Sequence, residues 1–387
     1  MRRIRKFLAF WYRLVPWVVK YPANSLLQKF QIMCDYIHLY NKKGLTRDEY
    51  YEFAFETKSK EFRDTFLGKN EQRHYLDLLN PVRYYTTARN KYIAHKILEA
   101  AGVKMATLYC YYCPEGSVAN NDEIASDVKS VVRILKSKDV KSCIIKPTEE
   151  SHGDNVVVVK SIEYHDDDCL LNLYNGDSKF ISQLLANNPL IFESLINQTY
   201  QMASLNKSSV NTVRFMTTLY PNGEAKLVAA FIKIGREGQC VDNAGSGGNV
   251  DAGVDVHIGK LYHTIRYDGI RKVVPIENHP DSNATIEGLI IDDWTDIVKR
   301  VLEYQQAFPF VKAAGWDIAI TNDGPVVVEV NDMWDRTGQL FLGRGWRNEI
   351  RDCYKAWKSC GVSYPMYRQA NELLHSQLSK IERYESC

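Results

Sequence analysis

Two carboxylates and an amide lie close together within residues 315–331. This stretch consists of two apolar runs joined by a short Asn-Asp-Gly segment, a composition typical of a β-hairpin. Pairing across a three-residue loop places Asp317 directly opposite Glu329, although a bulge at Gly324 would shift the pairing by one residue. Because side chains alternate along strands, Asn331 shares a face with both carboxylates, and apolar residues fill the other face.

Two neighbouring carboxylates repel each other unless a cation or a proton lies between them. A set of Asp, Glu and Asn oxygens suits Mg²⁺, which keeps several waters and usually completes its octahedron with phosphate oxygens. We therefore predict that Asp317, Glu329 and Asn331 hold magnesium. An ordinary acidic face on a solvent-exposed hairpin is the alternative that these residues alone leave open.

A second pair of apolar runs carries candidate phosphate-binding groups. Lys146 ends the first run, and a polar segment containing Ser151, His152 and Gly153 precedes the second. Backbone N–H groups of such a loop can donate to phosphate oxygens, and the lysine supplies a point charge. The segment is not a Walker A loop, and a plain surface turn remains the alternative.

Two basic residues lie on a third predicted hairpin. Arg214 belongs to the run 212–220 and Lys233 to the run 226–234, with a Pro-Asn-Gly turn between them. Their side chains are placed to converge on one anion, whereas two solvated cations on neighbouring strands would repel weakly. The glycine-rich segment 242–249 that follows suits either a loop around a substrate or a surface linker.

These groups must be positioned by elements that change character along the chain. Helical patterns dominate before about residue 142, and β-type runs separated by Gly, Asn and Asp dominate after it. We expect helices at 90–98, 122–135, 178–187, 294–306 and 366–384, and strands at 143–146, 156–162, 170–174, 190–196, 212–220, 226–234, 260–265, 316–320 and 326–330.

The composition is that of an ordinary globular protein. With 387 residues, 45% of them hydrophobic, the chain can bury the core of more than one domain. Lys and Arg total 49 against 47 Asp and Glu, so no charge excess indicates a nucleic-acid partner. Nine scattered cysteines fit a reduced compartment, which predicts a cytoplasmic location.

Residues 1–20 combine basic side chains with Trp, Phe, Leu and Val. The segment is too short and too charged to span a bilayer or to serve as a secretory signal. A basic segment of this kind can lie in the interface of an anionic membrane, which would place the protein on the inner face. A helix packed on the protein's own surface has the same spacing, so both readings stay open.

The order of these elements resembles the ATP-grasp superfamily over roughly residues 90 to 331. In that family a strand lysine and a glycine-containing loop cover the phosphates, a hinge strand receives adenine, and a late Asp…Glu-x-Asn set holds magnesium. The resemblance implies ATP and Mg²⁺ as cofactors. Besides the phosphate-side residues above, it implies nucleotide contacts from Lys91, Glu193, Leu195, Ile196 and Gln198.

The middle of the chain is similar to the sugar-transfer-associated ATP-grasp proteins and to glutamate-adding carboxylate–amine ligases. That similarity implies catalytic roles for Arg214, Lys233 and Asn243, although the pattern favours Arg at position 233 and a lysine cannot make a bidentate fork. The implied fold is α+β, with two lobes that clasp ATP. The expected regions are a helical N-terminal arm at 1–80, a small α/β pre-ATP-grasp region at 81–141, a small lobe at 142–197, and a large lobe at 198–387.

The resemblance implies an ATP-dependent carboxylate–amine ligase that works through an acyl phosphate. Its partners would be ATP and a carboxylate- and amine-bearing small molecule, a sugar or an amino acid in surface-polysaccharide biosynthesis. Two alternatives stay open: an ATP-grasp kinase that phosphorylates a hydroxyl, and a non-catalytic nucleotide-binding protein. The chain contains no convincing Ser-His-Asp or Cys-His arrangement, which agrees with chemistry that needs no protein nucleophile.

Overall fold

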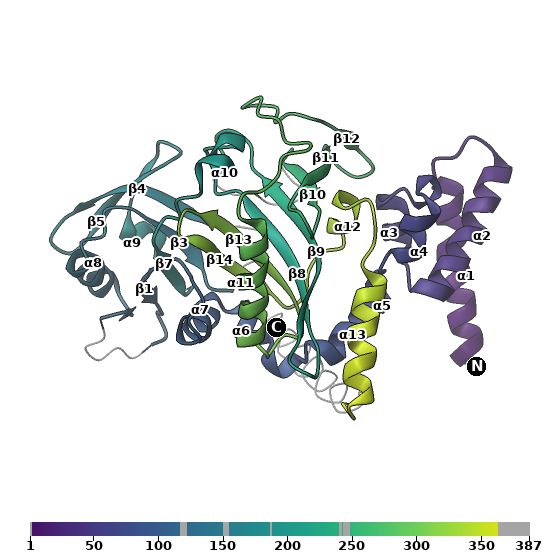
Figure 1. The fold of residues 1–387 in the computed structure, drawn as a ribbon, viewed down its shortest axis with the longest axis horizontal. Helices are drawn as coiled ribbons and strands as arrows, with labels where there is room; N and C mark the ends of the chain where they lie inside the picture. Colours follow the sequence, from purple (N-terminus) through teal and green to yellow (C-terminus); the bar gives the residue numbers. More distant parts are fainter. Residues whose placement is uncertain are drawn as a thin grey trace, which may run out of the picture.

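Two seven-stranded sheets form the centre of the molecule, with helices packed around them and a helical arm at one end (Figure 1). This computed structural model describes residues 2–116, 122–149, 155–185, 188–239, 242 and 248–362, and the side chains from residue 9 onward. The expected α+β class is confirmed. The helix expected at 366–384 lies outside the described residues.

The first sheet has the strand order β2-β1-β7-β3-β4-β5-β6. Its strands are β1 (Leu108–Tyr112), β2 (Ile124–Ala125), β3 (Cys143–Pro147), β4 (Val157–Tyr164), β5 (Cys169–Leu173), β6 (Ser178–Phe180) and β7 (Leu190–Glu193). Helix α8 (Val128–Ser137) covers it with a fully buried row that includes Val131 and Leu135. Because β1 pairs with β7, the sheet crosses the domain boundary expected at residue 142.

The second sheet has the order β12-β11-β10-β9-β8-β13-β14. Its strands are β8 (Thr212–Leu219), β9 (Ala225–Ile234), β10 (Val250–Val254), β11 (Leu261–Tyr267), β12 (Val273–Pro275), β13 (Ala313–Thr321) and β14 (Gly324–Asn331). Helix α11 (Trp294–Ala307) packs on β8 and β9 with Trp294, Ile297 and Val301, which recur at helical spacing. The Trp294 ring stacks on Phe215 with centroids 5.2 Å apart.

The N-terminal arm contains α1 (Arg2–Lys20), α2 (Leu26–Lys43), α3 (Arg47–Glu52), the 3₁₀ turn η1 (Phe55–Thr57), α4 (Lys60–Thr65) and α5 (Lys69–Leu79). The side chains of Leu14 and Val18 are buried in an aromatic cluster with Tyr36 and Tyr50. Helix α1 therefore packs on the protein's own surface along this face. None of the helices in the described part of the chain is long and apolar enough to cross a membrane.

Helix α7 (Lys91–Ala100) lies where the two sheets meet. It begins at the N-cap Asn90, whose side chain accepts a hydrogen bond from Ile93 N, and it is followed by Gly102 in the left-handed region at φ 75°. Just beyond it, Met105 forms a parallel bridge with Val327 of β14. The short η2 (Val82–Tyr84) and α6 (Tyr85–Arg89) precede α7, so the chain from 82 to 105 couples the sheets.

Several elements differ from the sequence-based expectations. Residues 178–187 begin with the exposed edge strand β6 and a four-residue helix, α9 (Ile181–Leu184), and only the later part of 122–135 is helical. Strand β10 was hidden by Gly253: a Cβ there would lie 2.7 Å from the Tyr262 ring, so the glycine permits close packing. The expectations also missed α10 (Tyr200–Leu205), α12 (Gly338–Phe341) and α13 (Arg347–Ser359).

Candidate active site

The predicted pairing of Asp317 with Glu329 is confirmed, but the turn that produces it differs from the expected one. Thr321 pairs with Gly324 across a two-residue loop, and a register shift between Asp317 and Ile318 restores the Asp317–Glu329 pair. The bulge lies inside the hairpin rather than at its loop. Asp317 is buried, with 6% of its side chain exposed, whereas 33% of the Glu329 side chain is exposed.

Arg214 and Lys233 both bind the Asp317 carboxylate. Arg214 lies directly opposite Asp317 on β8, and its Nε and Nη2 donate to Oδ1 and Oδ2 at 2.6 and 2.8 Å. Lys233 reaches Oδ1 at 3.1 Å from β9. Burial alone would raise the pKa of Asp317, but Arg214 and then Lys233 hold it well below the usual range. The two basic residues thus converge on an anion, as expected, and here that anion belongs to the protein.

Asp242 was not singled out from the sequence, yet it completes this charge cluster. It lies 3.8 Å from the Lys233 ammonium, and its Oδ2 accepts hydrogen bonds from the backbone N and the hydroxyl of Thr212 at 2.8 and 2.5 Å. Burial raises the pKa of Asp242, although Lys233 opposes the shift. The only feature of the sequence that could have indicated a role for Asp242 was its position at the start of the glycine-rich segment 242–249.

Lys146 forms the corresponding group on the first sheet. Its ammonium lies 2.8 Å from Glu193 Oε2, and His95 Nδ1 lies 3.1 Å from Glu193 Oε1. All three side chains are buried. Burial opposes ionisation of Glu193, but Lys146 and His95 lower its pKa to about 2. Glu193 therefore ends β7 as the partner of a buried lysine, and the adenine contact implied by the resemblance stays a prediction.

Helix α7 links these two clusters. Lys91, in its first turn, lies 3.6 Å from Glu329 of the second sheet, while His95, one turn later, contacts Glu193 of the first. Residues four positions apart lie on one helix face. The cluster around Glu329 and the cluster around Glu193 therefore contact α7 about one turn apart. Sequence reasoning placed Lys91 beside the nucleotide but missed His95, whose i+4 spacing from Lys91 was the available signal.

The remaining predicted nucleotide residues lie on the segment that leads from β7 to α10. Leu195 and Ile196 are partly buried there. Gln198 uses both ends of its amide internally: Nε2 donates to Asn206 O and Ser209 O at 3.1 and 3.0 Å, and Oε1 accepts from Asn211 N at 3.0 Å. A ribose contact from Gln198 would have to share these atoms. Ser151, His152, Gly153 and Asn243 lie outside the described residues.

The expected magnesium ligands are present but engaged. Asp317 is held by Arg214 and Lys233, Glu329 lies near Lys91, and the Asn331 amide donates to Gly315 O at 3.4 Å. Within the part of the chain that the structure describes, no three His, Cys, Asp or Glu side chains form a metal-binding group. Two carboxylates and one amide still fit a hard cation that takes most of its ligands from phosphates and water.

A family model described as sugar-transfer associated ATP-grasp matches residues 70–355, more than half of the chain. The chain belongs to this family. The match begins inside α5, so helices α1 to α4 of this ATP-grasp protein lie outside it. A comparison with curated proteins found no significant match.

Solved structures similar to this ATP-grasp protein include three enzymes of low sequence identity. A biotin carboxylase from Campylobacter jejuni is 10% identical with a TM-score of 0.41, and the match covers 72% of this chain and 48% of that one. A phosphoribosylamine–glycine ligase from Thermotoga maritima is 10% identical, with coverage of 79% and 64% and a TM-score of 0.41. A D-Ala:D-Ser ligase from Enterococcus faecalis is 11% identical, with coverage of 70% and 61% and a TM-score of 0.41. The chain spans less than two thirds of each.

Proposed function

We propose that this ATP-grasp protein is an ATP-dependent carboxylate–amine ligase that works through an acyl phosphate. One observation carries the proposal: Arg214 and Lys233 converge on the Asp317 carboxylate, directly opposite Glu329. Three cations (Arg214, Lys233 and Lys91) are interleaved with three carboxylates in this cluster. Such a balance can accept a further cation and a phosphate together without a large net charge.

In this proposal Asp317, Glu329 and Asn331 hold Mg²⁺, which supplies charge neutralisation for the phosphate oxygens when it is bound. Lys146 binds the phosphates from the opposite sheet, and Arg214 binds the transferred phosphoryl group or the substrate carboxylate. The bonds of 2.6 and 2.8 Å from Arg214 Nε and Nη2 to Asp317 show that this guanidinium takes a carboxylate as a fork. A substrate carboxylate or phosphoryl group would have to share these atoms or use Nη1.

The proposed reaction has two steps. An oxygen of the substrate carboxylate forms a bond to the γ-phosphorus, the bond from that phosphorus to the β-phosphate oxygen breaks, and ADP leaves. The amine nitrogen then forms a bond to the acyl carbon, the acyl carbon–oxygen bond breaks, and phosphate leaves with the amine proton passing to phosphate or solvent. Positioning and charge carry both steps, so no protein nucleophile is required.

Product analysis tests this proposal. We expect incubation with Mg-ATP, a panel of sugar acids and amino acids, and amine acceptors to yield ADP, free phosphate and an amide. Oxygen-18 in the substrate carboxylate should appear in the released phosphate. If mass spectrometry instead finds phosphate attached to a hydroxyl of the product, the protein is a kinase. Nucleotide binding without ADP formation on the whole panel would favour a non-catalytic protein.

We propose a sugar or amino-acid substrate in surface-polysaccharide biosynthesis, and the family description, sugar-transfer associated, supports the link to sugars. A cytoplasmic location is part of the same proposal and rests on the scattered cysteines. We also propose that α1 touches the inner face of an anionic membrane. Leu14 and Val18 are buried, so this contact would use the outward stripe of Tyr12, Val15 and Val19, which are 82%, 48% and 62% exposed. Amphipathic helices bind membrane interfaces through such apolar stripes flanked by basic residues.

A further inference from the structure

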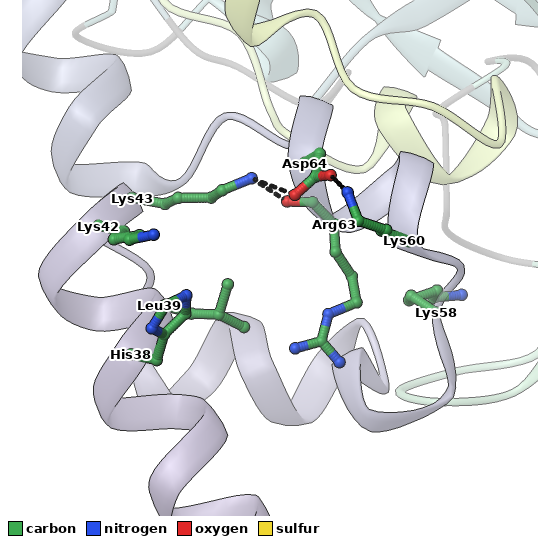
Figure 2. Close-up of a pocket in the computed structure, with 8 residues that line it drawn as sticks. All are labelled: His38, Leu39, Lys42, Lys43, Lys58, Lys60, Arg63 and Asp64. Carbon is green, nitrogen blue, oxygen red and sulfur yellow. Dashed lines mark hydrogen bonds and ion pairs between the residues drawn. The ribbon is translucent and has the colours of Figure 1, made fainter.

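A second candidate binding site lies in the N-terminal arm, in a cavity of about 400 Å³ between α2 and α4. Figure 2 shows side chains from α2 on one side of the cavity and those of α4 and the residue after η1 on the other. The lining consists of His38, Leu39, Lys42, Lys43, Lys58, Lys60, Arg63 and Asp64. In Figure 1 these helices lie at the opposite end of the molecule from the first sheet.

The lining is strongly cationic. Five of the eight lining residues are Lys or Arg, and Asp64 is the only carboxylate among them. Asp64 pairs with Lys60 and lies 3.8 Å from Lys43, while Arg63 pairs with Asp35 outside the cavity. Ordinary protein surfaces interleave both signs of charge, so an excess of one sign in a concave space concentrates counter-ions there.

Lys43 is a largely buried member of this cation set. Only 11% of its side chain is exposed, and its ammonium donates to Arg63 O. Burial lowers the pKa of Lys43 to about 8, an effect that the partly exposed Asp64 opposes incompletely. Lys42 and Lys58 form no ion pair with any residue that the structure describes, although the Lys58 ammonium lies 5.4 Å from the centroid of the Phe62 ring. An additional anion in the cavity would therefore stabilise charges that the protein alone does not balance.

We propose that this cavity is a binding site for a phosphate-bearing ligand, separate from the ATP site. Lysine ammonium groups act as point charges for phosphate, and several of them around one space suit an anion with more than one charge. A volume of about 400 Å³ is within the range of small-molecule sites and exceeds the needs of a single ion. The phosphate can belong to a soluble metabolite or to a lipid headgroup. The second source has support from Leu26, Leu27 and Phe30 on the same helix, which are 87%, 68% and 58% exposed.

Calorimetric titration of the full chain with inorganic pyrophosphate tests the site. Lys42→Gln/Lys60→Gln changes two exposed lining residues and should weaken pyrophosphate binding about tenfold, which corresponds to about 1.4 kcal/mol. The matched control is Lys136→Gln/Lys179→Gln, which removes the same charge from exposed positions on the first-sheet side and should bind as the wild type does. Equal affinity of the lining variant and this control would overturn the proposal.

A gain of affinity provides a stricter test, because misfolding does not produce one. Asp64→Asn keeps the side-chain size and frees Lys43 and Lys60 from their carboxylate partner, so pyrophosphate should bind several-fold more tightly. Unchanged or weaker binding would contradict the proposed site. Lys146→Ala should leave this titration unchanged while it weakens ATP binding, so failure of the cavity and failure of the nucleotide site are distinguishable.

Flotation with vesicles separates the two sources of phosphate, provided that every variant also carries Tyr12→Ser/Val15→Ser, so that the proposed α1 contact does not hold the protein on the membrane. We compare vesicles of phosphatidylcholine alone with vesicles that also contain phosphatidic acid. If Lys42→Gln/Lys60→Gln no longer floats with the vesicles that contain phosphatidic acid while the control variant still does, the ligand is a lipid headgroup. Weakened pyrophosphate binding with unchanged flotation identifies a soluble phosphorylated molecule. Both results support the cavity, and a variant that is unchanged in both assays refutes it.

Discussion

Replacing Asp317 by asparagine should cost stability as well as activity. The carboxylate accepts two bonds from Arg214 and one contact from Lys233 at 2.6, 2.8 and 3.1 Å, and 6% of its side chain is exposed. Removing one partner of a buried ion pair costs about 3–5 kcal/mol because the remaining charges stay buried without compensation. We expect about 3 kcal/mol, the lower end, because asparagine keeps one acceptor oxygen.

Glu329→Gln is the matched comparison on the neighbouring strand. One third of the Glu329 side chain is exposed and its distance to Lys91 is 3.6 Å, so the loss of its charge should cost at most about 1 kcal/mol. Both variants should lose Mg-dependent ATP turnover, since both remove a carboxylate from the proposed metal site. Only the Asp317 variant should unfold at lower temperature.

Thermal unfolding followed in parallel with ADP release checks this difference. For a chain of this length about 3 kcal/mol lowers the unfolding midpoint by roughly 4 °C. Equal midpoints for the two variants would show that the Arg214–Asp317–Lys233 cluster does not stabilise the fold. Wild-type turnover of both variants at limiting magnesium would refute the metal site itself.

Further perturbations address the other clusters. Glu193→Gln should lose about 3 kcal/mol of stability at neutral pH; because the folded pKa of Glu193 is about 2, this difference should persist above about pH 4.5 and shrink as pH falls below it. A gap that stays constant from pH 7 to about pH 3 would contradict this assignment. Lys146→Ala should weaken both ATP affinity and turnover, because its ammonium binds phosphates in the ground and transition states alike; calorimetry that finds wild-type nucleotide affinity would remove Lys146 from the site. Arg214→Ala should spare ATP binding but abolish ligation, a split visible in calorimetry and ADP release. Tyr12→Ser/Val15→Ser should reduce binding to anionic vesicles without unfolding the protein, since both side chains point outward; unchanged co-sedimentation would leave α1 as a packed helix only.

Sequence patterns predicted those helices and strands whose formation depends mainly on residues close together in the chain. The 294–306 prediction matches α11 to within one residue, because helical spacing depends on neighbours in the chain. Strand β10 was not predicted, because its Gly253 is required by close contact with Tyr262 and Phe341. Both of these residues are remote from β10 in sequence, so no local pattern indicated the strand. Strand β6 escaped it because an exposed edge strand has no buried face to mark.

The sequence by itself determined which residue types carry the chemistry of the candidate site. An acidic pair with an amide on one hairpin, and two basic residues on another, were visible from alternation and turn residues alone. The tertiary structure decided how these charges are partnered: Arg214 and Lys233 neutralise Asp317, and Lys146 pairs with Glu193 and His95. It also formed the basic cavity between α2 and α4. Which charged side chains pair with each other depends on which strands and helices become neighbours. The hydrophobic packing of whole sheets and helices decides these neighbours.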